Sequence, residues 1–195
     1  MLGKQAKTLS SAQVKTVLLH LERSRNPLRN RLIFLLSIKA GLRAKEIAEM
    51  TWRMVTDAQG EISHEIRLEN SASKGRSGGG VIAMNSELRQ TLVDWRRKSW
   101  ILDGKAQIIS TERSAGTTAG VIVNLIRSWY LELGFEGCSS HSGRRTFITN
   151  AARKISLVGG SLRDVQALAR HSSLSTTQRY IECDVDAQRR VVELI

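Results

Sequence analysis

The stretch from Leu28 to Ala40 is apolar around much of its circumference, so it should fold as a helix inside the protein. Both ends carry boundary signals. Asn26 followed by Pro27 is typical of an N-cap and a first helical residue, and Gly41 is typical of a helix end. The sequence therefore predicts a buried helix, which the rest of the chain has to cover. Its apolar residues include Ile33, Phe34, Leu35, Leu36 and Ile38.

Helical spacing recurs along most of the chain. Ser10 and Gln13 fit a capping box, and Val14, Val17 and Leu21 then fall on one face of a helix. A short helix should follow Gly41. Further helices are predicted at Ser86–Trp100, Thr117–Leu133, Gly143–Arg153, Ser161–Ala169, Thr176–Glu182 and Asp186–Leu194.

Strand-like patterns are confined to one region. Trp52–Val55 and Glu61–Leu68 have the expected alternation, with His64 on the same side as its apolar neighbours. A glycine-rich turn over residues 71–80 then leads back into a strand at Val81–Met84. The predicted class is α+β and mainly α, with one small antiparallel sheet of two or three strands. No linker divides the chain, so we expect one domain over residues 1–195.

The chain is basic, since 30 Lys and Arg against 18 Asp and Glu give a formal net charge of +12. Its pI near 10.5 exceeds the value of about 9 that is typical of a nucleic-acid binder. Solubility or general anion affinity gives the same charge. Two cysteines, Cys138 and Cys183, fit neither a disulfide framework nor a zinc site, which favours a reducing cytoplasm. Neither a membrane span nor a signal peptide is predicted.

Two arginines lie where an anion can bind. Arg43 directly follows the buried helix at the start of the next one, where a helix N-terminus favours anions, and Glu46 is placed one turn on to orient it. His141 and Arg144 share one face if a helix begins there. The histidine can move protons and the arginine can grip two phosphate oxygens, a role for which Arg145 competes. Ordinary surface residues give the same two patterns.

Three more residues complete a set with phosphate chemistry. Lys74 sits in the glycine-rich turn, where it can reach over a bound anion or simply be solvated. His171 and Tyr180 are nine residues apart, with a turn between two helices. The same segment has the pattern of helices and turn that is typical of a DNA-binding helix-turn-helix motif. The only other tyrosine, Tyr130, lies in a core-like helix.

Together and in this order, these residues resemble the tyrosine recombinase (phage integrase) family, over nearly the whole chain from about Leu9. Gly41-Leu-Arg43-x-x-Glu46 resembles the first arginine box of that family, and Ser73-Lys74-Gly75 resembles its hairpin lysine. His141-x-x-Arg144 resembles the central box. His171-Ser-Ser followed by Thr-Thr-Gln-Arg-Tyr180 resembles the last box, which contains the nucleophile.

The resemblance implies the catalytic core of a tyrosine recombinase, with the DNA breaking-rejoining fold. It implies a site-specific recombinase or integrase that cuts and rejoins DNA through a covalent 3′-phosphotyrosyl intermediate, without metal, ATP or another cofactor. Expected partners are double-stranded DNA and further copies of the chain, as a tetramer in the synaptic complex, with no membrane and no small-molecule substrate. The expected setting is the cytoplasm, with the chain encoded by a prokaryote, a phage or a mobile element.

The resemblance also implies roles for particular residues. Arg43 and Arg144 hold the non-bridging phosphate oxygens, Glu46 supports Arg43, and His171 adds a hydrogen bond to the phosphate. Tyr180 attacks the phosphorus.

Two residues would move protons in this reaction. Free tyrosine has a pKa of about 10, so a base must help it, and His141 is the candidate. Lys74 protonates the departing 5′ oxygen.

Further DNA contacts are expected from Lys45, Arg76, Arg145, Arg170 and Arg179.

The chain departs from the family pattern at two places. Arg170 stands where the family usually has glycine before the last-box histidine, which leaves room for crowding or for an added phosphate contact. About eight residues precede the first predicted helix, so we expect the separate N-terminal DNA-clamping domain to be absent. The tail over residues 183–195 either packs on its own core or docks on a neighbouring subunit.

Two alternative functions remain, a catalytically impaired DNA-binding relative and a tyrosine-type topoisomerase.

Overall fold

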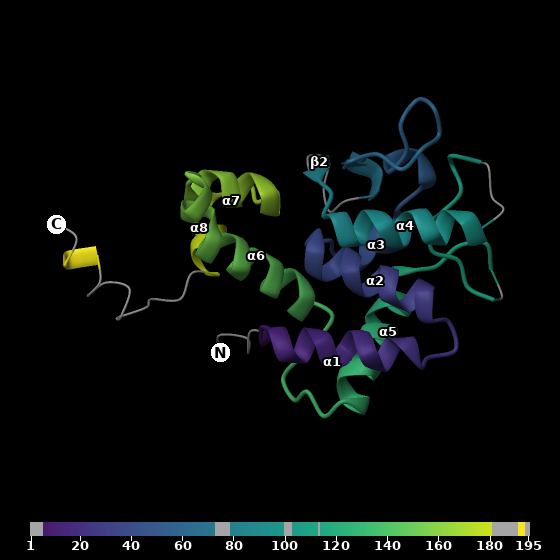
Figure 1. Cartoon of the computed structure of the whole chain (residues 1–195), viewed down its shortest axis with the longest axis horizontal. Coiled ribbons are helices and arrows are strands. Elements are labelled where there is room, and N and C mark those ends of the chain that lie inside the picture. The colour runs from purple at the N-terminus through teal and green to yellow at the C-terminus, as the bar shows by residue number, and fades with distance from the viewer. Residues whose placement is uncertain (1–5, 73–78, 100–102, 113, 181–190, 194–195) are drawn as a thin grey trace. The chain divides into compact units, whose positions relative to one another are not determined.

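The computed structural model describes residues 6–72, 79–99, 103–112, 114–180 and 191–193. The chain forms two compact units, residues 1–147 and 148–195, and helix α6 (Ser142–Lys154) crosses the boundary between them. In the described residues there are eight α-helices and one two-stranded sheet (Figure 1), so the predicted mainly helical α+β class is confirmed. The expectation of a single domain stays a prediction. None of the helices in these ranges is long and apolar enough to cross a bilayer.

Helix α1 (Ser11–Glu22) begins at the predicted capping box. The Gln13 backbone N–H donates to Ser10 Oγ, and the Ser10 N–H donates to Gln13 Oε1 at 2.9 Å. Val17 and Leu21 are completely buried, as the helical spacing predicts. The buried Leu9 N–H donates to Thr146 Oγ1 at 2.8 Å. The entry to α1 is thereby tied to the first turns of α6, which carry candidate site residues.

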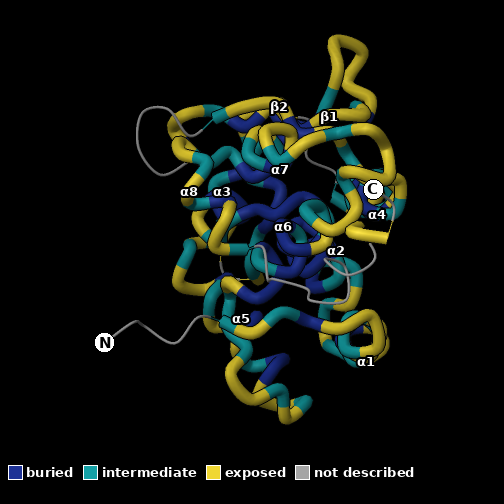
Figure 2. The backbone as a smooth tube through the Cα atoms, turned by 90° about the vertical axis from the view of Figure 1, so that its left-hand side faces the viewer, coloured by how far each residue is buried: buried dark blue, intermediate teal, exposed yellow. Residues whose placement is uncertain are grey.

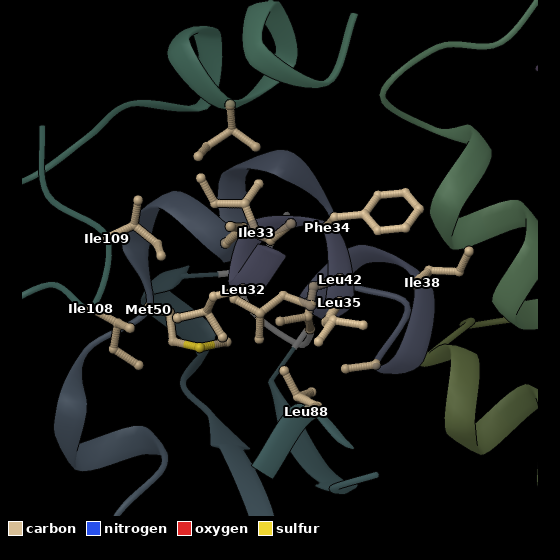
Figure 3. Packing of buried hydrophobic residues seen from close by; sticks show 14 of the residues in the cluster. Leu32, Ile33, Phe34, Leu35, Ile38, Leu42, Met50, Leu88, Ile108 and Ile109 are labelled. Atoms are coloured by element: carbon tan, nitrogen blue, oxygen red, sulfur yellow. The ribbon is translucent and has the colours of Figure 1, made fainter. Parts of the chain in front are cut away.

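Helix α2 (Pro27–Lys39) is the buried helix that the sequence predicts. Its residues from Leu32 to Leu36 have no exposed surface, and its tube is mostly coloured as buried in Figure 2. It packs against α1, α3 (Ala44–Glu49) and α4 (Ser86–Lys98), while α5 (Ala119–Glu132) packs against α1 and α3. Figure 3 shows Leu88 of α4 and Met50, Ile108 and Ile109 gathered around α2. The core therefore fixes the position of the α2–α3 turn.

The sheet consists of β1 (Glu65–Leu68) and β2 (Gly80–Ala83), which pair antiparallel with Ile66 opposite Ile82. The returning strand is confirmed, but the strand predicted from Glu61 is too long. Regular pairing begins at Glu65, and Ile62 only makes an isolated bridge to Thr56. His64, predicted on the buried side, is exposed because it lies in the bend before the strand begins.

The strand predicted at Trp52–Val55 is wrong, because Trp52–Met54 is a 3-10 helix. Its backbone closes locally, with the Val55 N–H donating to the Trp52 carbonyl at 3.0 Å. Trp52 and Met54 are buried while Arg53 between them is half exposed. An alternation this short therefore fits a tight helical turn as well as a strand.

The second unit contains the end of α6, α7 (Leu162–Ala169) and α8 (Leu174–Gln178). Asp164 accepts from the Ser161 backbone N–H at 2.7 Å and caps the start of α7. The helix predicted at Thr176–Glu182 begins two residues earlier, because the Ser173 hydroxyl accepts from the Thr176 N–H and caps it there. Tyr180 consequently follows α8 instead of lying within it. Most of the tail, including residues 186–190 of the last predicted helix, lies outside the described residues.

Candidate active site

Arg43 lies at the N-cap of α3 with an extended backbone, directly after the buried helix. The carboxylate of Glu46 holds it twice, accepting from the Arg43 backbone N–H at 2.8 Å and from its guanidinium at 2.7 Å. Glu46 has no exposed surface, whereas about a third of the Arg43 side chain is exposed. The predicted pair is therefore present. A buried carboxylate fixes the arginine while leaving part of the guanidinium accessible.

Arg144 reaches the same turn from α6. Its side chain is buried, and its guanidinium donates to the carbonyl of Gly41, two residues before Arg43. Gly41 has a φ of +63°, a left-handed conformation that glycine adopts without strain. The turn after α2 thus anchors both candidate phosphate-binding arginines within the first unit.

Two glycines permit this close approach of α6 to the end of α2. A Cβ at Gly41 would overlap the ring of Phe147, and a Cβ at Gly143 would overlap the side chain of Ser37. Neither residue can carry a larger side chain without a shift of its neighbours. The short distance between the backbones lets Arg144 reach the Gly41 carbonyl.

His141 immediately precedes α6 and is exposed, whereas Arg144 one turn later is buried. The imidazole Nδ1 lies 3.3 Å from Ser140 Oγ, and the backbone carbonyl accepts from the Arg145 N–H at 2.9 Å. The predicted helix start is confirmed. The two side chains nevertheless differ in exposure, since His141 lies before α6 and Arg144 lies in its buried first turn.

Three of the other candidate basic residues lie in the described part of the chain and are at least partly exposed. Lys45 is exposed and forms a 3.7 Å ion pair with Glu49, and Arg145 is half-buried. Arg179 is exposed next to Tyr180. Lys74 and Arg76 lie outside the described residues, so their predicted positions in the hairpin turn stay predictions.

His171 and Tyr180 are neighbours within the second unit. Their rings stack with centroids 5.4 Å apart and an interplanar angle of 28°. His171 Nδ1 lies 3.0 Å from the hydroxyl oxygen of Thr177, which is completely buried, and Thr149 Oγ1 donates to the Tyr180 carbonyl at 3.3 Å. Sequence reasoning missed both threonines. Only the spacing of the Thr-Thr pair from the histidine could have pointed to one of them.

Arg170 adopts a left-handed backbone conformation, with φ +52° and ψ +47°, and is the one described non-glycine residue with a positive φ. It ends α7, and the N–H of the next residue, His171, donates to the Gln166 carbonyl at 3.1 Å. The Gln166 side chain returns a hydrogen bond to the His171 carbonyl at 3.0 Å. The turn at Arg170 therefore positions His171. Its backbone conformation is one for which glycine is the least strained residue.

The two tyrosines have opposite environments. Tyr130 on α5 is 1% exposed, and burial raises its pKa far above the ordinary value. Such a phenol is a poor nucleophile because ionising it inside the core is costly. Tyr180 is only half-buried and lies against an imidazole ring. Among the described residues, no group of three or more His, Cys, Asp or Glu could hold a metal ion.

Comparison with known proteins identifies the class. The sequence model of the phage integrase family matches residues 7–186, and the chain belongs to that family. No curated protein sequence matches it significantly.

Solved structures agree with this assignment at the level of the fold. XerA recombinase is similar over 96% of this chain and 65% of its own, with 22% identity and a TM-score of 0.72. The Tn1549 transposon integrase in complex with a circular intermediate DNA covers 98% of this chain and 66% of its own, with 19% identity and a TM-score of 0.74. A lambda integrase dimer bound to a core site is similar over 92% of this chain and 49% of its own, with 18% identity and a TM-score of 0.67. The chain thus spans two thirds or less of the length of these proteins.

Proposed function

We propose that this chain is the catalytic domain of a site-specific DNA recombinase that cleaves and rejoins strands through a covalent 3′-phosphotyrosyl intermediate. One observation supports it most. Arg43 and Arg144, from different helices, are anchored at the same turn after α2. Two fixed guanidinium groups at one turn suit an anion with two non-bridging oxygens. The Tn1549 and lambda integrases share the fold, and their structures contain DNA.

The first step is attack of Tyr180 Oη on the phosphorus. A bond from Oη to phosphorus forms, the bond from phosphorus to the 5′ oxygen breaks, and the 3′ side of the strand stays on the protein. Negative charge builds on the non-bridging oxygens of the five-coordinate phosphorus. Arg43 and Arg144 stabilise that charge, and preorganised cations of this kind usually supply the largest catalytic contribution.

Proton movements complete the step. His141 takes the phenolic proton of Tyr180, and its exposure leaves it accessible to a bound strand. His171 donates a hydrogen bond to the phosphate, and Lys74 protonates the departing 5′ oxygen. A 5′ hydroxyl from another strand then attacks the phosphotyrosine and reverses the chemistry, so that the phosphotyrosyl bond conserves the energy of the broken one and no ATP is consumed.

Covalent trapping on a nicked suicide substrate tests this assignment. The target site is first sought in the DNA that flanks the gene. Wild-type protein should form an adduct that resists denaturation, and Tyr180→Phe should form none. Tyr130→Phe is the matched control, because the Tyr130 hydroxyl is buried with no hydrogen-bond partner among the described residues, and it should behave like wild type. Adduct formation by Tyr180→Phe at the wild-type level would remove Tyr180 from its role.

Arg170 favours a second candidate, a relative that binds DNA without cutting it. A bulky residue in a left-handed turn directly before His171 can displace the histidine from the position that a glycine turn would give it. Such a protein retains DNA on every substrate and forms no adduct. In both cases binding should weaken steeply as salt rises, because Lys and Arg contacts to phosphates release counterions. Relaxation of supercoiled plasmid without sequence preference would instead indicate a topoisomerase.

A further inference from the structure

Two adjacent threonines of α8 have different surroundings. Thr176 is half-buried, and its hydroxyl lies 3.1 Å from the hydroxyl of the capping residue Ser173. Thr177 has no exposed surface, and its hydroxyl oxygen lies 3.0 Å from Nδ1 of His171. Only the second threonine therefore contacts a residue of the candidate site.

The direction of the Thr177 hydrogen bond follows from burial. Within the described ranges, the bond to His171 is the only hydrogen bond of the Thr177 hydroxyl. A buried hydroxyl proton needs an acceptor, and no other described group provides one. If Nδ1–H donated to Thr177, the hydroxyl proton would be left buried and unsatisfied, which is costly. The hydroxyl therefore donates and Nδ1 accepts.

The choice of tautomer follows from that direction. A neutral imidazole has one N–H and one acceptor nitrogen, and the hydrogen bond at one nitrogen fixes the proton on the other. With Nδ1 as the acceptor, His171 bears its proton on Nε2. An Nε2–H can donate to a phosphate oxygen, whereas a bare Nε2 would repel it.

We propose that Thr177 is a positioning residue that holds His171 as the Nε2–H tautomer with its ring stacked against Tyr180. This proposal rests on the proposed function for its consequence, donation to the phosphate, but not for the tautomer itself. The ring stack at 5.4 Å gives the imidazole its second constraint. One contact fixes the proton and the other fixes the plane of the ring, so the donor is prepared before DNA arrives.

Nitrogen-15 NMR of the imidazole groups in the full-length chain tests the tautomer without DNA. The chain has four histidines, and the His171 signals are assigned as those lost in His171→Asn. Wild-type His171 should show a protonated Nε2 and an unprotonated Nδ1. Thr177→Val, of similar size but without the hydroxyl, should give a mixture of tautomers. Thr177→Ser should restore the wild-type pattern, and Thr176→Val should leave it unchanged.

The covalent trapping assay gives a second, separate measurement. We expect Thr177→Val to slow adduct formation about 10- to 100-fold, as when the partner that orients a metal-bound histidine is removed, with recovery in Thr177→Ser. Absence of adduct in wild type, together with the predicted spectra, would refute the proposed function and leave the tautomer assignment standing. A wild-type Nδ1–H signal, or a Thr177→Val spectrum identical to wild type, would overturn the role of Thr177. Far-UV circular dichroism confirms that each variant is folded, and if Thr177→Val is not, the nitrogen that is protonated in wild-type His171 decides.

Discussion

The candidate site residues of the two units are held in different ways. In the first unit, Arg43 and Arg144 are held by a fully buried carboxylate and by the backbone carbonyl at the end of the core helix. In the second unit, His171 and Tyr180 flank the five-residue α8 and are held by one ring stack and by threonine hydroxyls. The charged groups depend on the hydrophobic core, whereas the proposed nucleophile is held by the His171 ring and by a hydrogen bond from Thr149.

This difference suits the two proposed tasks. Stabilising a charged transition state requires cations whose position costs nothing at the moment of reaction, and the core around α2 supplies that rigidity. An attacking phenol has to approach the phosphorus and later leave it. A half-buried residue after a short helix has fewer contacts to break than a residue in the core. Substitutions in the first unit should therefore cost more than substitutions in the second.

The largest effect is expected from Arg144→Ala. Loss of a preorganised donor to the phosphate should slow adduct formation about 10²- to 10³-fold. Arg144→Lys should recover only part of the rate, since an ammonium lacks the planar fork of a guanidinium. Single-turnover trapping measures the rate, with the exposed Arg127→Ala as the control. A wild-type rate in Arg144→Ala, confirmed as folded by its melting curve, would show that Arg144 does not hold the phosphate.

Glu46→Gln should have the next largest effect, on stability. The amide has the size of the carboxylate but turns one acceptor into a donor, which then faces the Arg43 N–H groups. We expect the free energy of unfolding to fall by about 2 kcal/mol, the cost of an unsatisfied buried polar group. Urea unfolding measures it. Glu49→Gln, the control, removes a half-exposed partner of Lys45 and should lower the free energy of unfolding by less than about 0.5 kcal/mol. Equal losses in both variants would contradict a larger contribution from the buried Glu46.

Arg170→Gly should change stability in the opposite direction. Glycine adopts φ +52° without the strain that arginine has there, so the free energy of unfolding should rise by about 1 kcal/mol. Arg163→Gly, in the first turn of α7, should lower it by less than about 1 kcal/mol, the cost of glycine in a helix interior. Thermal melting of both variants measures the difference. A loss of stability in Arg170→Gly would mean that the contacts of the arginine side chain outweigh its backbone strain.

Several features of the first unit are predictable from the sequence for a physical reason. The helix ends at Ser10 and Gly41 depend on local chemistry, a capping hydroxyl and a left-handed backbone, and both are visible in a short window. The Arg43–Glu46 pair is likewise local, since residues three apart lie on neighbouring positions of a helix. Features of this kind are predictable without knowledge of the fold.

The missed features depend on the three-dimensional structure. Thr149 reaches the Tyr180 carbonyl across 31 residues, and nothing in its own surroundings in the sequence indicates that contact. Thr177 is hidden in a polar stretch whose composition suggests exposure. The 3-10 helix at Trp52–Met54 has the alternation of a strand, because burial of two residues on either side of an exposed one fits both structures.

The smallest effect is expected at the cap of α7, the helix that leads to Arg170 and His171. Hydrogen bonds from Ser161 lower the pKa of the exposed Asp164 carboxyl. A lowered pKa in the folded state means that the ionised carboxylate stabilises the fold at neutral pH, and that this contribution is lost as the pH falls through the folded-state pKa. Melting temperatures of wild type and Asp164→Asn should therefore differ slightly at neutral pH and converge as the pH falls below the ordinary carboxyl pKa of about 4 and through the lowered folded-state pKa. Ser161→Ala, which removes the hydroxyl but keeps the backbone donor, should fall between them. A difference that stays constant with pH would show that the cap acts through its geometry and not through its charge.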